Sequence, residues 1–153
     1  MLNKIKKQNK GFTIIEVMIV LAIAGLILLI VFLAVPALQR QSRNTQIKND
    51  AGTISGAIST FESNNNGSLP TNISGTGTVT LSAGAATDSA KVSPTTAVQV
   101  VTSVPAPATT APALSTIDVF LGHTCNGNVS PRATCVFYST ETGSGQQQQS
   151  IES

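Results

Sequence analysis

Hydrophobic and polar positions divide the 153-residue chain into two contrasting parts. Residues 12–38 are almost all apolar, and the nineteen residues from Val17 to Val35 carry no charge and no side-chain hydrogen-bonding group. At about 1.5 Å per residue, a helix of that length spans roughly 28 Å, close to the ~30 Å hydrocarbon thickness of a bilayer. The pattern therefore predicts one transmembrane helix over residues 12–38.

The hydrophobic period changes after this segment. Five apolar residues recur at spacings of four, three, four and three, which predicts one face of an amphipathic helix over residues 39–65: Ile47, Ala51, Ile54, Ile58 and Phe61. Asn64 to Gly67 tolerate left-handed backbone and should end this helix, and Pro70 prevents it from resuming. Pro36 is expected either to kink the helix or to begin a new one.

The remainder of the chain is typical of short strands. Alternating or β-branched runs predict them at TVTL (78–81), VQV (98–100), IDVFL (117–121) and CVFY (135–138). We therefore expect an α+β fold, with a long amino-terminal helix packed on a small antiparallel β-sheet head over residues 66–145. The Pro/Thr/Ala-rich stretch at 103–112 predicts an extended surface loop, and the Gln-rich tail at 146–153 is expected to be disordered.

Basic charge is concentrated at the amino end. Four of the nine basic residues precede Gly11: Lys4, Lys6, Lys7 and Lys10. Without residues 1–11, five basic residues would face seven acidic ones (5 − 7 = −2), so the overall charge of +2 belongs to that segment. A basic patch has little to be built from, and nucleic acid is not an expected partner. Lysines on this side of the span also place the amino terminus in the cytoplasm.

Cys125 and Cys135 are the only cysteines, and nine residues separate them. Downstream of a membrane span, this spacing favours a disulfide formed in an oxidising compartment, which would close the loop between the last two predicted strands. A structural zinc site takes four ligands, more than these thiols and the single His123 provide, so no metal is expected. His123 has no catalytic partners recognisable in the sequence, and we expect neither an enzyme nor a cofactor.

Glu16 is the one acid inside the apolar segment, and interpretations of that segment differ in how they treat it. A cleavable secretory signal would use the small-x-small run at residues 22–24, but it would leave an apolar new terminus and an acid within the hydrophobic region. A plain signal anchor explains the span and the lysines, whereas nothing in an anchor requires an acid.

A cut between Gly11 and Phe12 would give this acid a partner. The new α-ammonium of Phe12 would lie four residues, about one helical turn, before Glu16. Between staggered chains, the carboxylate of one helix could meet the amine of the next. Because a buried charge left unpaired is strongly unfavourable, only one axial register would satisfy both groups. Glu16 would then set the register of an assembly.

The residues KGFTIIEV, from Lys10 to Val17, resemble the processing and assembly motif of type IV prepilins. The resemblance implies a leader peptide of residues 1–11, a membrane prepilin peptidase that cuts after Gly11, and N-methylation of Phe12. It also implies the type IV pilin fold and a helical homopolymer in which the Phe12 amine pairs with Glu16. An inner-membrane assembly platform with cytoplasmic ATPases would extend the filament.

From the residues and the resemblance we expect the major subunit of an extracellular pilus. Before assembly it would be a single-pass membrane protein with a cytoplasmic amino terminus. The filament would serve adhesion or twitching motility, with a host or neighbouring cell surface as its contact. Two alternatives remain open. A pseudopilin or minor pilin of a secretion or DNA-uptake apparatus would share the amino terminus, and a signal-anchored extracellular binding domain would share only the span.

Overall fold

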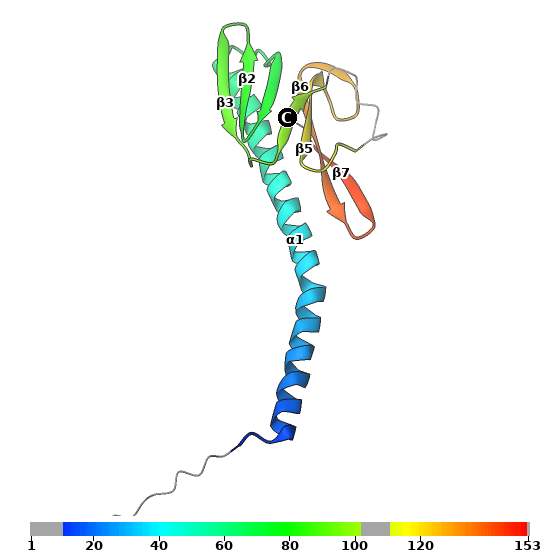
Figure 1. Ribbon diagram of the computed structural model, residues 1–153. Coiled ribbons are helices and arrows are strands. Elements are labelled where there is room, and N and C mark those ends of the chain that lie inside the picture. Colours follow the sequence, from blue (N-terminus) through cyan, green and yellow to red (C-terminus); the bar gives the residue numbers. More distant parts are fainter. Residues whose placement is uncertain (1–10, 102–110, 153) are drawn as a thin grey trace, which may run out of the picture. The chain divides into compact units, whose positions relative to one another are not determined.

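The computed structural model describes residues 11–101 and 111–152. The predicted leader, apart from Gly11, and most of the predicted loop at 103–112 lie outside the described residues. The chain divides into two compact units, residues 1–38 and residues 39–153. One helix, α1 (Ile14–Asn64), contributes residues to both units (Figure 1). Among the described residues of the second unit, seven strands follow it: β1 (Asn72–Thr76), β2 (Thr78–Ala83), β3 (Ala86–Lys91), β4 (Ala97–Val100), β5 (Thr116–His123), β6 (Val129–Thr142) and β7 (Gly145–Glu152).

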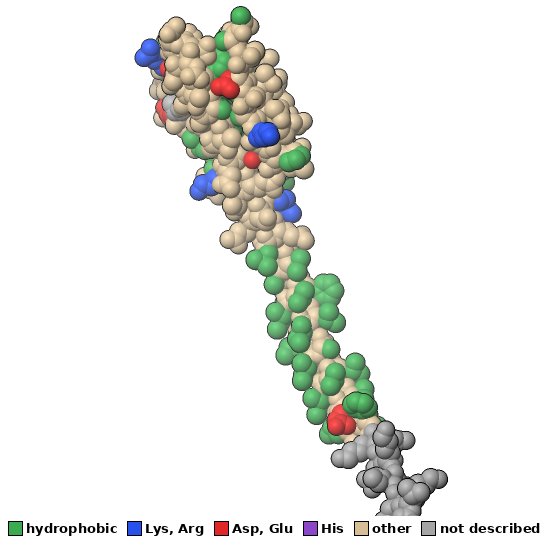
Figure 2. Space-filling view, turned by 90° about the vertical axis from the view of Figure 1, so that its left-hand side faces the viewer, with side chains coloured by type: hydrophobic (Ala, Val, Ile, Leu, Met, Phe, Trp, Pro, Cys, Tyr) green, Lys and Arg blue, Asp and Glu red, His purple; other side chains and the backbone are tan. Residues whose placement is uncertain are grey.

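In the first unit, α1 is a helix without a buried face. Every residue from Gly11 to Leu38 is exposed, and hydrophobic side chains cover this part of the helix in Figure 2. Pro36 lies inside α1, so the predicted alternative of a new helix at this residue is wrong. A proline in a helix removes one backbone hydrogen bond, and the helix-forming leucine and alanine residues around Pro36 continue α1 through it.

The carboxyl end of α1 is fixed by backbone geometry. Asn66 and Gly67 adopt left-handed backbone, with φ of 55° and 79°, and the Gly67 N–H donates to the Glu62 carbonyl at 2.8 Å. This bond runs from the second residue past the cap back into the last turn, as in a Schellman motif. The predicted helix end at Asn64 to Gly67 is confirmed.

In the second unit, α1 packs its apolar stripe against one face of the sheet. All five predicted stripe residues are buried, which confirms the predicted amphipathic helix. They share a core with the inward-facing strand residues Ile73, Val79, Leu81, Val98, Ile117, Val119, Val136 and Tyr138. The predicted α+β fold, a long helix on a β-sheet, is confirmed.

The sheet has the strand order β3-β2-β1-β4-β5-β6-β7 (Figure 1). Neighbouring strands are antiparallel except β4 and β5, which are parallel, so the sheet is mostly rather than wholly antiparallel. The connection between β4 and β5, residues 101–115, is long enough for the return that a parallel pair requires.

The four predicted strand runs lie in β2, β4, β5 and β6, but three strands differ from the sequence prediction. β1 and β3 were not predicted, because each has only one buried side chain and little β-branched apolar sequence. The predicted disordered tail is wrong for residues 146–152, which form most of β7. Pairing with β6 satisfies the backbone of β7 and holds this polar sequence in a strand.

Candidate functional site

The amino end of α1 carries a capping box made by Thr13 and Glu16. The backbone N–H and the hydroxyl of Thr13 both donate to Glu16 Oε2 at 2.8 Å, and the Glu16 N–H donates to Thr13 Oγ1 at 3.4 Å. Thr13 therefore occupies the N-cap position, and the acid three residues later satisfies its free N–H. The prediction from sequence missed this role, although a Thr-x-x-Glu run before an apolar stretch is the usual sequence signal for a capping box.

The capping box leaves part of the Glu16 carboxylate unused. Both hydrogen bonds to this side chain use Oε2, and no described residue bonds to Oε1 or forms an ion pair with Glu16. The acid is exposed in the first turn of the helix, where a partial positive charge of the helix dipole favours it. Since the N–H that it accepts belongs to the Phe12–Thr13 peptide bond, a cut before Phe12 would leave the capping box intact.

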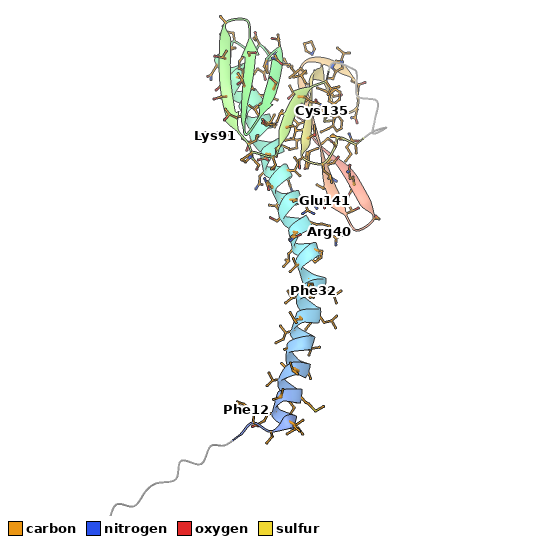
Figure 3. All side chains as sticks on the ribbon, viewed as in Figure 1. Phe12, Phe32, Arg40, Lys91, Cys135 and Glu141 are labelled. Atoms are coloured by element: carbon orange, nitrogen blue, oxygen red, sulfur yellow. A yellow bond between two sulfur atoms is a disulfide. The ribbon has the colours of Figure 1, made fainter. Side chains whose placement is uncertain are left out.

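Gly11 and Phe12 lie just before the helix, at the point of the predicted cut. Figure 3 shows Phe12 at this end of α1. The side chain of Phe12 is 89% exposed. A Cβ placed on Gly11 would meet nothing within 4 Å, and the backbone of Gly11 is not left-handed. The described structure therefore gives no steric reason for glycine at this position.

The apolar part of α1 is a candidate membrane span. By length and composition α1 is the one helix among the described residues that could cross a membrane, and its most apolar window is wholly exposed. Large side chains such as Phe32 and Leu33 are 75% and 73% exposed. A continuous apolar surface of this extent indicates a surface that is covered by lipid or by other protein.

The predicted disulfide is present between Cys125 and Cys135, whose Cα atoms are 5.1 Å apart. It links the β5–β6 connection to β6, beside the edge-to-face pair of Phe120 and Phe137, whose ring centroids are 5.3 Å apart. The prediction placed this loop between the last two strands, whereas β7 follows it. The disulfide and the two rings form a small second core, separate from the core under α1.

His123 lies at the end of β5, where its ring contacts the backbone. Its Nδ1 lies 3.0 Å from the carbonyl of Leu121, two residues earlier in the same strand. Among the described residues, no group of three or more His, Cys, Asp or Glu side chains is placed to hold a metal ion.

Two polar contacts in the second unit were not predicted. Arg43 donates to Glu141 from Nε at 2.6 Å and from Nη2 at 2.7 Å, so β6 is held to α1 by a bidentate ion pair. This hydrogen bonding lowers the pKa of the Glu141 carboxyl and raises the pKa of Arg43. Asn44 accepts from the Glu141 N–H at 2.7 Å and donates to its carbonyl at 2.8 Å.

The second contact is made by Asp50, which is 7% exposed on α1. It accepts hydrogen bonds from the Ser93 N–H, the Ser93 hydroxyl and the Thr96 hydroxyl, all in the β3–β4 connection. Asp50 lies on the same helix face as the predicted stripe, three residues after Ile47. An acid within an apolar stripe was the available sequence signal.

Comparison with known proteins gives one match. The family model described as the prokaryotic N-terminal methylation motif matches residues 6–32, which include Gly11, Phe12 and Glu16. No curated protein and no solved structure matches the chain. The motif implies processing by a prepilin peptidase and assembly into pilus-type filaments. Type IV pilins, which carry this motif, are structural proteins rather than enzymes.

The motif and the fold agree with each other. A long apolar helix behind the methylation motif fits a membrane-anchored prepilin that is later assembled into a pilus, and the α+β architecture is consistent with the type IV pilin fold. Over residues 6–32, the chain carries the amino-terminal signal motif of type IV prepilins.

Proposed function

We propose that this chain is the precursor of the major subunit of an extracellular type IV pilus. A prepilin peptidase removes residues 1–11 by cutting between Gly11 and Phe12, and the new amino group of Phe12 is methylated. The observation that carries the proposal is the methylation motif over residues 6–32, which leads directly into an exposed apolar helix with one acid in its first turn.

In this proposal Glu16 fixes the stagger between neighbouring helices. The cut creates a cation at Phe12, and the carboxylate has an oxygen, Oε1, that the capping box does not use. In a filament core that excludes water, a carboxylate or ammonium without a partner is strongly destabilising, by about 3–5 kcal/mol when one member of a buried pair is removed. Only the axial register that joins the two groups avoids this penalty.

The apolar surface of α1 would serve two environments in turn. Before assembly the apolar part of α1 lies in the membrane. The amino terminus is in the cytoplasm, because the lysines that precede the span favour that orientation. During assembly, helix packing replaces acyl chains with equally apolar neighbours, so extraction is not opposed by a large loss of solvation. An inner-membrane platform and cytoplasmic ATPases would drive extension, and the heads would meet a host or neighbouring cell surface in adhesion or twitching.

Variants at two residues separate the register role of Glu16 from its capping role. Glu16→Gln keeps a side chain that can complete a capping box but removes the charge, whereas Thr13→Ala weakens the cap and keeps the charge. Loss of a cap costs about 0.5–2 kcal/mol, less than the about 3–5 kcal/mol for a buried charge left without its partner. We therefore expect Glu16→Gln and Glu16→Val to insert in the membrane and to be cut but to lose filaments, while Thr13→Ala retains them.

Filaments are sheared from cells that express only the variant, and the amount of chain in them is compared with the amount in membranes. The sheared fraction is also examined by electron microscopy. Wild-type filament abundance with Glu16→Val would defeat the register argument. If the wild-type chain is cleaved and methylated but forms no filaments on the cell surface, a pseudopilin would be favoured over a major pilin.

A further inference from the structure

The two edges of the sheet, β3 and β7, differ in how they are protected. An uncovered edge strand presents unpaired backbone groups to other chains, and charged side chains on the edge discourage pairing. β3 carries Asp88 and Lys91, and the Asp88 carboxylate accepts the Ser89 N–H at 2.7 Å. The β3 edge therefore has both charges and a backbone donor that is already bonded.

β7 has neither form of protection over most of its length. From Gly145 to Ile151 it contains no charge and no proline, and four consecutive residues are glutamines, Gln146 to Gln149. Gln146, Gln147 and Ser150 are exposed. No described residue hydrogen-bonds to the side-chain amides of these four glutamines.

Side-chain contacts around the β6–β7 hairpin determine which backbone groups face outward. The hydroxyls of Thr142 and Thr140, on β6, donate to the carbonyls of Gly145 and Gln147, so these carbonyls face β6. The backbone N–H and carbonyl of Glu141 bond to the Asn44 side chain on α1, so they are not used in bonds to β7.

Glu141 lies directly opposite Gln146 in the register. Because the backbone N–H and carbonyl of Glu141 bond to Asn44, this pair does not exchange backbone hydrogen bonds. Because orientation alternates along an antiparallel strand, the backbone groups of Gln146, Gln148 and Ser150 point away from the sheet. The outer edge of β7, the last strand in the sheet order (Figure 1), thus offers a regular row of donors and acceptors.

We propose that this β7 edge binds the β7 edge of a second copy of this chain, as an antiparallel pair centred on Gln149. In this register the outward residues of one copy meet those of the other: Gln146 lies opposite Glu152, and Gln148 lies opposite Ser150. Gln149 lies opposite its own copy as a pair that does not exchange backbone hydrogen bonds. Strand addition of this kind draws its affinity from main-chain hydrogen bonds.

The sequence of β7 favours a second copy over a foreign strand because it is self-complementary in this register. The single acid, Glu152, meets an amide rather than another acid, so no like charges face each other. Glutamine side chains on adjacent strands can also bond to one another through their amides. The contact joins two heads, is independent of the Phe12–Glu16 pairing, and does not require the proposed pilus function.

Cysteine cross-linking of the full chain in membranes tests the register. Both native cysteines are held in the Cys125–Cys135 disulfide, so an introduced thiol is the only free one. In the proposed pair the two Gln149 Cα atoms are about 4.5 Å apart, within disulfide range, whereas the two Gln147 positions are displaced by four residues, about 14 Å along the strands. Under mild oxidation, we expect Gln149→Cys to give at least about tenfold more linked dimer than Gln147→Cys.

A second pair of variants tests the backbone bonds themselves. In the Gln149→Cys chain, Ser150→Pro removes an outward N–H without touching the bonds to β6, and Ser150→Ala keeps that N–H. We expect the proline variant to reduce the linked dimer at least about fivefold and the alanine variant to retain it. If the proline variant fails to fold, the comparison between positions 149 and 147 still decides the question.

Three results would overturn the proposal. They are equal linking at the two cysteine positions, no dimer at Gln149→Cys in a folded chain, and linkage of that thiol to a different protein instead of a second copy. Because the assay uses uncut chain in membranes, its failure leaves the proposed cleavage and filament assembly untouched.

Discussion

The buried carboxylate of Asp50 should stabilise the head by holding the β3–β4 connection against α1. Its Oδ1 accepts from the Ser93 N–H at 3.1 Å and the Ser93 hydroxyl at 3.2 Å, and its Oδ2 accepts from the Thr96 hydroxyl at 2.6 Å. Thr96 is 2% exposed, so water cannot replace the carboxylate there, whereas Ser93 is only half-buried. The effect of substitution therefore depends mainly on Thr96.

For Asp50→Ala we expect the free energy of unfolding of the head to fall by about 2–4 kcal/mol. A buried hydroxyl left without its partner costs about 1–3 kcal/mol, and a hydrogen bond to a charged group contributes about 1.5–3 kcal/mol. Relief of the burial of a carboxylate offsets part of this sum. In a Thr96→Val background, Asp50→Ala should lower the free energy of unfolding by about 1 kcal/mol or more less than in wild type. The reason is that the hydrogen bond between Thr96 and Asp50 is already lost in that background.

The assay is urea unfolding of the full chain in detergent, followed by tyrosine fluorescence. The chain has one tyrosine, Tyr138, which lies in the core under α1, and it has no tryptophan, so the signal reports the head. Hydrogen exchange of the Ser93 N–H should accelerate in parallel. A difference between Asp50→Ala and wild type below about 0.5 kcal/mol, at an unchanged urea slope, would show that Asp50 does not stabilise the head.

Two further predictions concern the head. Replacing Cys125 with serine should lower its unfolding free energy by about 2.5–3 kcal/mol under oxidising conditions, as expected for opening a loop of this length, and an unchanged melting temperature would remove the stabilising role of the disulfide. The Arg43–Glu141 pair should make stability pH-dependent. Because the folded-state pKa of Glu141 is lowered, its contribution is present above the ordinary value of 4.5 and is lost as pH falls through the lowered pKa. Wild type should therefore exceed Glu141→Gln in melting temperature at neutral pH and lose that advantage in acid; a constant difference would contradict the assignment.

Periodicity made much of this fold predictable. A helix buries a stripe that recurs every three or four residues, and the stripe from Ile47 to Phe61 packs on the sheet as expected. The helix end at Asn66 and Gly67 follows from the few residue types that adopt left-handed backbone. The cysteine pair was predictable because a membrane span upstream specifies an oxidising compartment.

Contacts between distant residues were not predictable in the same way. Nothing in the local sequence of Arg43 or Glu141 indicates a partner 98 residues away. β7 was missed because its composition is that of a disordered tail, and its strand conformation depends on pairing with β6. At the amino end, cleavage and methylation are events that a sequence motif predicts, while the capping box of Thr13 and Glu16 was available in the same residues and was overlooked.

The chemical state of the amino terminus shows whether this chain is processed as a prepilin. Amino-terminal sequencing and intact mass should be measured on the chain recovered from cells, with and without an active prepilin peptidase. With the peptidase we predict a chain that begins at Phe12, carries one added methyl group on its α-amine and contains one disulfide. A chain that begins at Met1 despite an active peptidase, or at Gly25 after a cut by signal peptidase, would rule out processing between Gly11 and Phe12.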